Sequence, residues 1–314
     1  MFAAHERRRH IGTHRTPFIS FGIIADMPVI GDEAVVLGRL DYSETSQILV
    51  LFTRAHGKVR AIAKGVKRST KTRFAVGVDL LDIGRVMLSS RQERGEALAT
   101  LTEWKQTRSL SGLREKLVRI HGGQYAGEIT AHLTEDWDPH AELFDALTAT
   151  LAGLAEAEEA LPAVVGYQWT LLDQIGSLPR FDACAACGRE NELTHFSSFE
   201  GGLVCRHCEP GRVEKWEVGA ATVALLREMD SYEWGMGNGE ERIEDCQLPI
   251  ADSRLAGEEA KRNENAARAE ESAGRTERSI VGAFAVLNYH IAHLMGREPL
   301  LAASLVPRGK RRTV

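Results

Sequence analysis

The 314-residue sequence lacks any hydrophobic stretch long enough to cross a membrane. A transmembrane helix needs about 20 consecutive apolar residues, and no run of eighteen occurs here. Hydrophobic residues make up 43% and charged residues 26% of the chain, which is the ordinary balance of a globular protein of two or three domains. A recognisable signal peptide is missing too, so we expect a cytoplasmic protein whose thiols stay reduced.

The common catalytic motifs are also missing. The sequence contains no G-x₄-G-K-[ST] phosphate loop, no H-E-x-x-H zinc-protease motif and no G-x-S-x-G nucleophile motif. The glycine-rich residues 235–239 lack the strand–helix–strand pattern that a dinucleotide site requires. With eleven histidines in the chain, some lie near acidic residues by chance, so such pairs do not identify a catalytic residue. We expect a protein that is not an enzyme.

An overall excess of positive charge is absent, since the formal net charge is −5. The charges are nevertheless unevenly spread, because residues 54–73 hold eight basic residues and no acid. Such a cluster can neutralise phosphates and release their counterions. The alternative is a solvated β-loop without a ligand, and Phe74 beside it is either a stacking face for a base or a core residue. The basic residues are Arg54, Lys58, Arg60, Lys64, Lys67, Arg68, Lys71 and Arg73.

Cysteine is scarce, but four of the five cysteines form a pattern. Cys184 and Cys187 make one C-x₂-C pair, Cys205 and Cys208 make a second, and seventeen residues separate the pairs. This spacing is typical of a four-thiolate zinc site. Four protein ligands leave no position for water or substrate, so we expect one structural Zn²⁺ ion. The alternative is two disulfides or four unligated thiols, and Cys246 is expected to be a free thiol.

From Glu33 to about Leu101 the sequence shows the pattern of short β-strands. Apolar and β-branched runs alternate with turn residues, as in residues 41–44. Five or six strands in about seventy residues predict a small barrel or sandwich, with an OB-like barrel as one candidate. The expected strands are residues 34–40, 47–53, 58–63, 76–83, 85–89 and 97–102, with Gly84 as a break.

From residue 110 to residue 176 the apolar period becomes that of helices. Leu113 and Leu117 begin a stripe, and the pair Gly122-Gly123 permits the close approach of a neighbouring helix. Asp138-Pro139 predicts the start of a second helix and Pro162 the start of a third. The stripe of the second helix, which we interpret as core, is Leu143, Leu147, Leu151 and Leu154.

Two charged segments interrupt this order. Residues 1–26 are rich in arginine and histidine, and we interpret them as a disordered extension or as an upstream misreading of a true start at Met27. Residues 252–278 carry charges of both signs and one large apolar residue, Leu255, so they predict a flexible insertion or an isolated charged helix. Apolar helical stripes surround this second segment, at residues 218–229 and 280–294.

The predicted fold class is α+β. We expect an OB-like β-barrel domain at residues 27–107, a helical domain at 108–180 and an inserted Cys₄ zinc module at 181–213. Residues 214–314 would return to the helical domain and carry a charged disordered insertion at about 235–276. The basic residues of the C-terminal tail are interpreted as solvated rather than as a second phosphate-binding site.

The local strings resemble those of the bacterial recombination-repair mediator family RecO. Residues 32–57, DEAVVLGRLDYSETSQILVLFTRAHG, and the following KVRAIAKGVKR resemble the N-terminal barrel of the family. The order of barrel, helices and Cys₄ module matches as well. The insertion at 235–276 and the acidic net charge depart from the family pattern. Shorter matches are ELFDAL at 142–147, FDACAACG at 181–188, GGLVCRHC at 201–208 and LNYHIAHLMGREP at 287–299.

The resemblance implies a non-enzymatic, nucleoid-associated protein of DNA repair and homologous recombination. Members of this family bind single- and double-stranded DNA, anneal complementary strands, act with RecR and single-strand-binding protein, and help to load RecA. A cationic barrel face suits this role, because annealing only requires that repulsion between two phosphate backbones be offset. The implied phosphate contacts are Lys58, Arg60, Lys64, Lys67, Arg68, Lys71 and Arg73, with Arg39 as a weaker candidate.

Two other functions compete with this interpretation. The first is a zinc-ribbon interaction module whose basic loop docks an acidic protein partner; it would bind an acidic peptide but not DNA. The second is a nucleic-acid enzyme, which would need a carboxylate cluster and a divalent metal or a nucleotide. The sequence shows a motif for neither of these enzymatic requirements.

Overall fold

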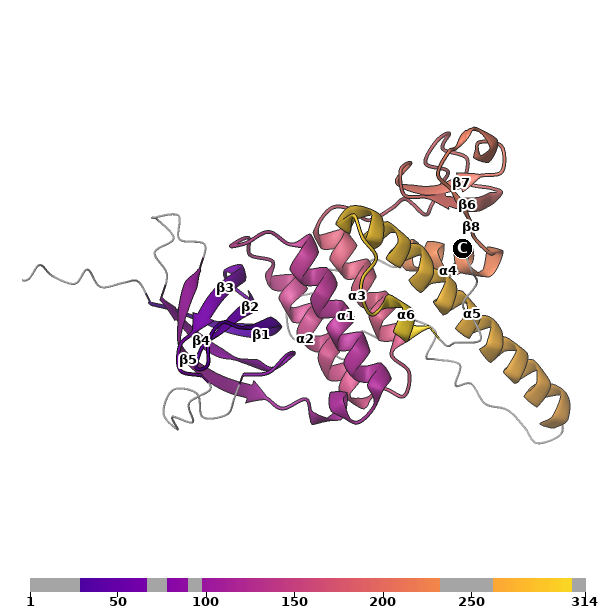
Figure 1. Ribbon diagram of the computed structural model, residues 1–314. Helices are drawn as coiled ribbons and strands as arrows, with labels where there is room; N and C mark the ends of the chain where they lie inside the picture. Colours follow the sequence, from indigo (N-terminus) through magenta and orange to yellow (C-terminus); the bar gives the residue numbers. More distant parts are fainter. Residues whose placement is uncertain (1–28, 67–77, 90–97, 232–261, 307–314) are drawn as a thin grey trace, which may run out of the picture.

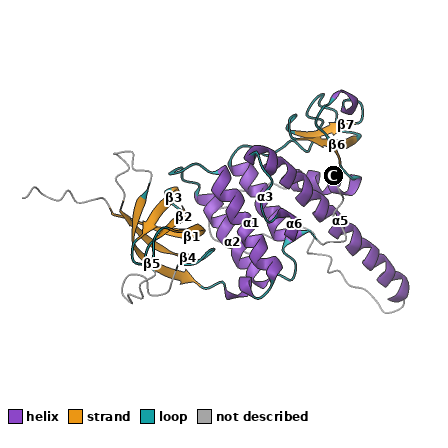
Figure 2. Ribbon diagram, in the orientation of Figure 1, coloured by secondary structure: helices purple, strands orange, loops and turns teal. Residues whose placement is uncertain are grey.

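The protein is described by a computed structural model, which covers residues 29–66, 78–89, 98–231 and 262–306. A β-barrel lies at one end, helices fill the middle, and a small sheet lies at the other end (Figure 1). The strands are thus confined to the two ends of the described structure, with the helices between them (Figure 2). This mixed arrangement confirms the predicted α+β class.

The N-terminal strands form a closed five-stranded barrel. The strand order is β1-β2-β3-β5-β4, in which β3 and β5 are parallel and the other neighbours are antiparallel. Alternate apolar residues fill the inside, including Leu49 and Leu51 of β2, which are fully buried. Closure leaves no sheet edge open. The strands are β1 (Val29–Asp41), β2 (Gln47–Thr53), β3 (Gly57–Ala63), β4 (Ile83–Ser89) and β5 (Ala99–Arg108).

The predicted strand at 76–83 and the predicted break at Gly84 are wrong where the structure describes them. Residues 78–82 form a turn, in which Leu81 has a positive φ of 65°. Gly84 is instead a paired residue within β4, opposite both Ala34 and Gln106. A Cβ at this position would lie 2.8 Å from the Trp104 ring, so glycine is needed there for packing.

Three helices form the centre of the molecule. They are α1 (Leu117–Leu133), α2 (Ala141–Glu156) and α3 (Leu161–Gln174). The leucine stripe of α2 is fully buried, as predicted. A Cβ on Gly122 would lie 3.2 Å from Leu154, and one on Gly123 would lie 3.0 Å from Leu151, which confirms the close approach of α2.

The apolar stripe predicted from residue 113 does not begin as expected. Leu113 is buried, but it belongs to a separate 3-10 helix, Ser111–Arg114. Leu117 is the first residue of α1 and is 70% exposed. The barrel packs on these helices through Phe52 of β2, whose ring lies 6.3 Å from that of Phe144 in α2.

The small sheet joins α3 to the last helices. It has the order β7-β6-β8, with β6 (Leu193–Ser197), β7 (Gly202–Cys205) and β8 (Trp216–Glu217). Its aromatic contact with the helices is a stack in which Phe181 lies between Trp169 of α3 and Phe196 of β6. The sheet is therefore fixed to the helical core by side-chain packing rather than by its connecting loops alone.

The last helices complete the bundle. They are α4 (Ala220–Ser231), α5 (Arg262–Met295) and α6 (Ala302–Leu305). The C-terminal part of α5 packs on α3 and α4, while its N-terminal part extends away from the bundle (Figure 1). Residues 262–276 are therefore helical and not disordered, which agrees with the charged-helix alternative; residues 235–261 lie outside the described structure. No helix among the described residues is long and apolar enough to span a membrane.

Candidate metal centre and cationic barrel face

The four predicted cysteines converge at one point. Each C-x₂-C pair forms a tight turn: the Gly188 amide donates to the Cys184 carbonyl at 2.8 Å, and the Cys208 amide donates to the Cys205 carbonyl at 3.0 Å. Gly188 adopts a φ of +74°, a conformation that glycine accepts without strain. The four Sγ atoms all lie within 4.8 Å of one another.

The thiols interact electrostatically. Burial of Cys184 opposes ionisation, but the backbone amides of Cys205, Cys187 and Ala186 outweigh it and lower the pKa of the Cys184 thiol to about 6. The Cys205 amide donates to Cys184 Sγ at 3.3 Å. Hydrogen bonds with Cys187 and Cys205 raise the pKa of Cys208 to about 12.

The cluster has the dimensions of a tetrahedral zinc site. Zn–S bonds of about 2.3 Å place tetrahedral ligand atoms about 3.8 Å apart, and Cys187 Sγ and Cys205 Sγ lie 3.7 Å apart. The donors are all sulfur, which zinc accepts readily in structural sites. Cys184 and Cys205 are buried, Cys208 is half-buried and Cys187 is exposed, so the cluster lies at the edge of the folded interior. The residues present are compatible with one zinc ion held by four thiolates.

The sheet that carries the cysteines is docked on α5 through one carboxylate. Glu214 accepts hydrogen bonds from the Ser197 hydroxyl at 2.6 Å, from the Phe199 amide at 3.2 Å and from the Tyr289 hydroxyl. Its pKa is lowered, because these donors and the Ser198 amide outweigh burial, which is the largest effect and acts in the opposite direction. A single acidic side chain thus joins the β6–β7 turn to α5.

A buried histidine on α5 makes a second junction. His290 Nε2 lies 3.0 Å from the Ser177 carbonyl, and His290 Nδ1 lies 2.7 Å from the Ser198 hydroxyl. A carbonyl can only accept, so Nε2 carries the proton and Nδ1 accepts from Ser198. Burial lowers the pKa of His290 and favours this neutral form.

The structure describes half of the eight predicted phosphate-binding residues. Arg39, Lys58, Arg60 and Lys64 lie within the described residues, and they do not share one environment. The others lie outside the described structure, as do Phe74 and Cys246; they are Lys67, Arg68, Lys71 and Arg73.

Arg60 and Lys64 point outward from β3 and its extension. Val59 and Ala61 belong to the barrel core, so the alternating residues of β3 face outside. The Arg60 side chain is 57% exposed and has Asp136 as a partner at 3.4 Å. An exposed ion pair of this kind contributes about 0–1 kcal/mol, so the guanidinium remains available to a phosphate. Lys64 is exposed directly after the strand.

Lys58 has a different role, although it lies two residues from Arg60. It is 7% exposed, and its ammonium donates to the Ala131 carbonyl at 2.7 Å and to the Thr134 carbonyl at the C-terminus of α1. Asp136 lies 3.4 Å away. Two hydrogen bonds and one ion pair thus occupy the ammonium within the protein. Lys58 therefore fastens the barrel to α1, and we leave it out of any ligand interface.

Arg39 is also occupied by internal partners. It pairs in register with Leu49, a core residue, so its side chain leaves β1 on the inner side of the sheet. Its guanidinium donates to the Val78 carbonyl at 3.3 Å and contacts Asp79 at 3.2 Å. Arg39 thus turns toward the loop before β4 and away from the outer face that carries Arg60.

Sequence reasoning missed two exposed residues beside the cationic face. Leu40 and Tyr42, at the end of β1 and just after it, are each 65% exposed. From the sequence, Tyr42 was expected in a turn and Leu40 in a strand, and neither was given a functional role. The alternation of inward and outward residues along β1 could have identified them. A large apolar side chain at an outward position of a strand does not pack in the core and therefore needs another explanation.

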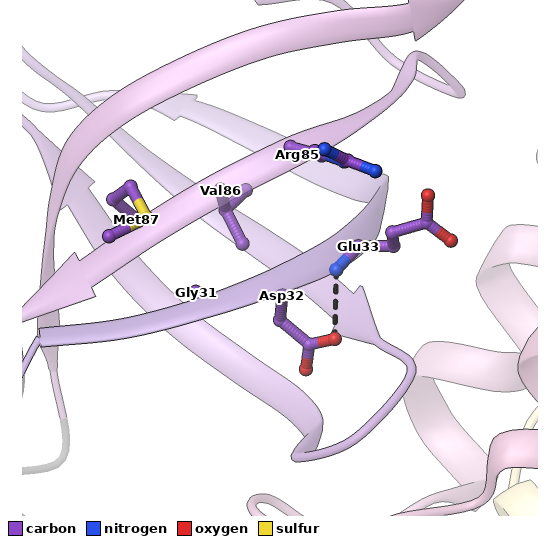
Figure 3. Close-up of a pocket in the computed structure, with 6 residues that line it drawn as sticks. All are labelled: Gly31, Asp32, Glu33, Arg85, Val86 and Met87. Atoms are coloured by element: carbon purple, nitrogen blue, oxygen red, sulfur yellow. Dashed lines mark hydrogen bonds between the residues drawn. The ribbon is translucent and has the colours of Figure 1, made fainter.

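The opposite outer side of the barrel has a different character. A shallow hollow between β1 and β4 is lined by Gly31, Asp32, Glu33, Arg85, Val86 and Met87 (Figure 3). Asp32 accepts hydrogen bonds from the amides of Glu33 and Ala55, and His56 contacts it at 2.7 Å. Asp32 pairs in register with the core residue Val86 and its side chain is 6% exposed, so the outer side carries only Glu33 opposite Arg85. One arginine opposite an acid does not form a cationic cluster, so this side is not a candidate for the same ligand.

Comparison with known proteins agrees with this architecture. The family model for the N-terminal domain of recombination protein O matches residues 27–110, and the model for its C-terminal domain matches residues 114–242. The DNA repair protein RecO of Rhodopirellula baltica is 34% identical over 203 residues, which cover 63% of this chain and 74% of that protein. The chain belongs to the RecO family.

Other RecO proteins give the same result. The DNA repair protein RecO of Anaeromyxobacter dehalogenans is 34% identical over 61% of this chain and 75% of its own length. That of Bacillus mycoides is 33% identical over 62% of this chain and 77% of its own length. The N-terminal RecO match includes all five barrel strands, and the C-terminal match includes the cysteine cluster and the helices from α1 to α4.

Proposed function

We propose that this RecO-family chain is a non-enzymatic mediator of DNA repair and homologous recombination at the nucleoid. In this proposal it binds single- and double-stranded DNA, anneals complementary strands, and acts with RecR to load RecA on strands coated by single-strand-binding protein. The proposal is supported by the relatives, which are named DNA repair protein RecO, and by the architecture of the barrel.

The observation that carries the proposal is the outer face of β3. Arg60 and Lys64 project from a five-stranded barrel whose order, β1-β2-β3-β5-β4, we interpret as that of an OB-type barrel. The same chain segment continues into Lys67, Arg68, Lys71 and Arg73 without an intervening acid. We propose these four, together with Arg60 and Lys64, as the phosphate contacts. Such contacts are independent of base sequence.

Annealing is the reaction that this face could promote without bond chemistry. Two strands repel one another through their phosphates, and a cationic surface offsets that repulsion by releasing condensed counterions. The protein must also leave the bases free to pair. An open, exposed face on a closed barrel meets both requirements, whereas a deep cleft would enclose the bases.

We also propose that the cysteine cluster holds one zinc ion with a purely structural role. The ion would supply folding free energy to the small sheet, because the ligands come together only in the folded chain. Cys184, Cys187, Cys205 and Cys208 would hold it. All four coordination positions would be filled by sulfur, so the ion would have no substrate.

The test is the annealing of two complementary oligonucleotides coated with single-strand-binding protein, without nucleotide or added divalent metal. We expect the folded, zinc-loaded chain to accelerate duplex formation well above the uncatalysed rate. A strand-length change that depends on added metal would instead indicate a nucleic-acid enzyme. If the folded protein neither binds nor anneals DNA, the proposal fails, and the basic loop becomes a docking site for an acidic protein.

A further inference from the structure

A small hollow lies where α1, α3, α5 and α6 meet. At this point α6 packs on α1 beside α5 (Figure 1). Apolar side chains form the floor of the hollow: Leu161 begins α3, Ile280 lies in α5, and Leu305 ends α6. Val118 and Ala160 complete the floor, and the volume is about 150 Å³. Sites for small molecules usually start at about 300 Å³, so this hollow is better suited to the side chains of a peptide.

The rim of the hollow is acidic. Among the residues that line it, three are acids and none is basic; they are Glu158 and Glu159, before α3, and Glu277 of α5. Lys116 and Arg119, which do not line the hollow, pair with Glu158. Glu159 is exposed, and within the described part of the chain no ion pair or hydrogen bond holds it. A hollow lined by charge of one sign favours a ligand of the opposite sign, here a cation.

A metal ion does not fit this rim. A divalent cation needs several carboxylate oxygens around one point, and among the described residues only the four cysteines bring three or more possible ligands together. The apolar floor supplies no oxygen ligand either. A basic peptide fits both features, because lysine and arginine lay their apolar stems on such a floor while their charged ends reach separate acids.

The segment that follows α6 has this chemistry. Residues 307–314, which lie outside the described structure, have the sequence PRGKRRTV, with four bases and no acid. They begin two residues after Leu305, which itself lines the hollow. Val306 leaves α6 in an extended conformation, with φ −92° and ψ 128°, as the residue before a proline favours. Eight extended residues reach about 26 Å, which is enough to cross the hollow from its own wall.

We propose that residues 307–314 dock in this hollow of the same chain. The stems of their basic side chains cover the apolar floor, and the charged ends pair with the acids of the rim. Attachment to α6 keeps the segment at an effective concentration of about millimolar, so weak contacts are sufficient to hold it. The docked bases are neutralised by acids of the chain itself and do not add to the cationic barrel face. The proposal stands whether or not the barrel binds DNA.

Cross-linking of the full-length chain tests the contact directly. A carbodiimide joins an amine to a carboxylate that it touches, and Lys310 is the one lysine of residues 307–314. We expect an amide between Lys310 and Glu159 or Glu277, identified by mass spectrometry after digestion. Lys310→Arg keeps the charge but lacks the amine, so it should lose this product. Products only with acids outside the hollow, or only between two chains, overturn the proposal. If Lys310 forms no product, the rate of protease cleavage decides.

Trypsin cleavage is this second measurement. Trypsin cuts after lysine and arginine, and docking protects residues 307–314 from it. Glu159→Gln with Glu277→Gln keeps the size of both side chains and removes two proposed ion pairs, which should speed release of the segment about 2- to 30-fold. Glu103→Gln, at an exposed position of β5, is the matched control and should leave the rate unchanged.

Thermal unfolding shows whether the rim variant keeps its fold. If the double variant is destabilised, Glu159→Gln alone still tests the proposal, because Glu159 is exposed, and it should speed release about 1.4- to 5-fold. Equal release rates for wild type, control and a stably folded rim variant overturn the docking. A failure of the wild type to bind DNA overturns the proposed function instead and leaves the docking in place.

Discussion

The cysteine cluster and the outer barrel face are two proposed binding sites of opposite construction. The cluster brings four like atoms within 4.8 Å and buries two of their residues. The barrel face spreads Arg60, Lys64 and their apolar neighbours over three strands and leaves them exposed. At a buried site that forms only on folding, the free energy of ligand binding stabilises the folded state. At an exposed, preformed face the ligand can bind and leave while the protein stays folded.

We expect the largest effect of a single substitution at the cysteine cluster. Cys205→Ser should abolish zinc retention and destabilise the protein by more than about 4 kcal/mol, because loss of a structural metal is among the strongest single-residue effects. Thermal unfolding and the zinc content of the purified protein measure this. Cys246→Ser is the matched control, since it removes a thiol and keeps all four ligands. Unchanged stability of a zinc-free Cys205→Ser protein would contradict a structural ion.

Charge reversal tests the open face without touching the fold. Lys64→Glu with Lys67→Glu and Arg68→Glu should weaken single-strand binding and reduce the slope of log affinity against log salt by about 0.7 for each phosphate that the variant no longer neutralises. Arg85→Glu, on the opposite side of the barrel, is the control and should leave the slope as it is. An unchanged slope in the folded triple variant would place the DNA site elsewhere.

Lys58 and Arg60 lie on the same strand, but we expect Lys58 to stabilise the contact between the barrel and α1 and Arg60 to bind phosphate. Lys58→Met should cost about 2 kcal/mol of stability, because the Ala131 and Thr134 carbonyls lose a charged donor. Arg60→Met should change stability by less than about 0.5 kcal/mol and weaken DNA binding. Urea unfolding measures the stability of both variants, and the salt dependence of DNA affinity measures their phosphate contacts. If Lys58→Met is as stable as wild type and lowers the salt slope, the assignment of the two residues is reversed.

The smallest expected effect is the pH dependence of the junction at His290. Its pKa is lower in the folded protein than in the unfolded chain, so the unfolded chain binds the extra proton first as pH falls. The stability that this residue contributes is therefore present above the ordinary histidine pKa of about 6.5 and is lost below it, at up to about 1.4 kcal/mol per pH unit.

His290→Gln is the variant that isolates this contribution. A glutamine amide can still donate to Ser177 and accept from Ser198, but it does not titrate. Denaturant unfolding at pH 5.5 and at pH 7.5 should show a shallower pH dependence for the variant than for wild type. Identical pH profiles would show that protonation of His290 does not loosen the junction.

The sequence was sufficient for features whose signal is local. Cysteine spacing predicted the cluster, because a C-x₂-C turn aims both thiols at one point whatever the rest of the chain does. The stripe of α2 followed from the apolar period, and the starts of α2 and α3 followed from Asp138-Pro139 and Pro162. The strand at residues 47–53 was predicted with its observed bounds for the same reason.

Features set by distant contacts escaped the sequence. Lys58 looks like its basic neighbours until Thr134 and Asp136, more than seventy residues away, are placed beside it. Gly84 reads as a strand break unless the ring of Trp104 is known to lie across it. The charged residues 262–276 lack an apolar face, so their pattern left disorder and an isolated helix undecided. For Lys58 and Gly84 the deciding partner is a distant residue in the folded structure.

Strand β3 is at once part of the proposed interface and part of the joint with the helices. Lys58 anchors its start in the last turn of α1, the Trp137 amide donates to the Lys58 carbonyl at 2.8 Å, and Arg54 before it holds Asp145 of α2 with two bonds. Tension on a strand bound at Arg60 would thus pass along β3 into the α1–α2 connection instead of bending a hinge. These contacts join the barrel to α1 and α2, so in the proposed function they would set the direction in which a bound strand leaves the protein.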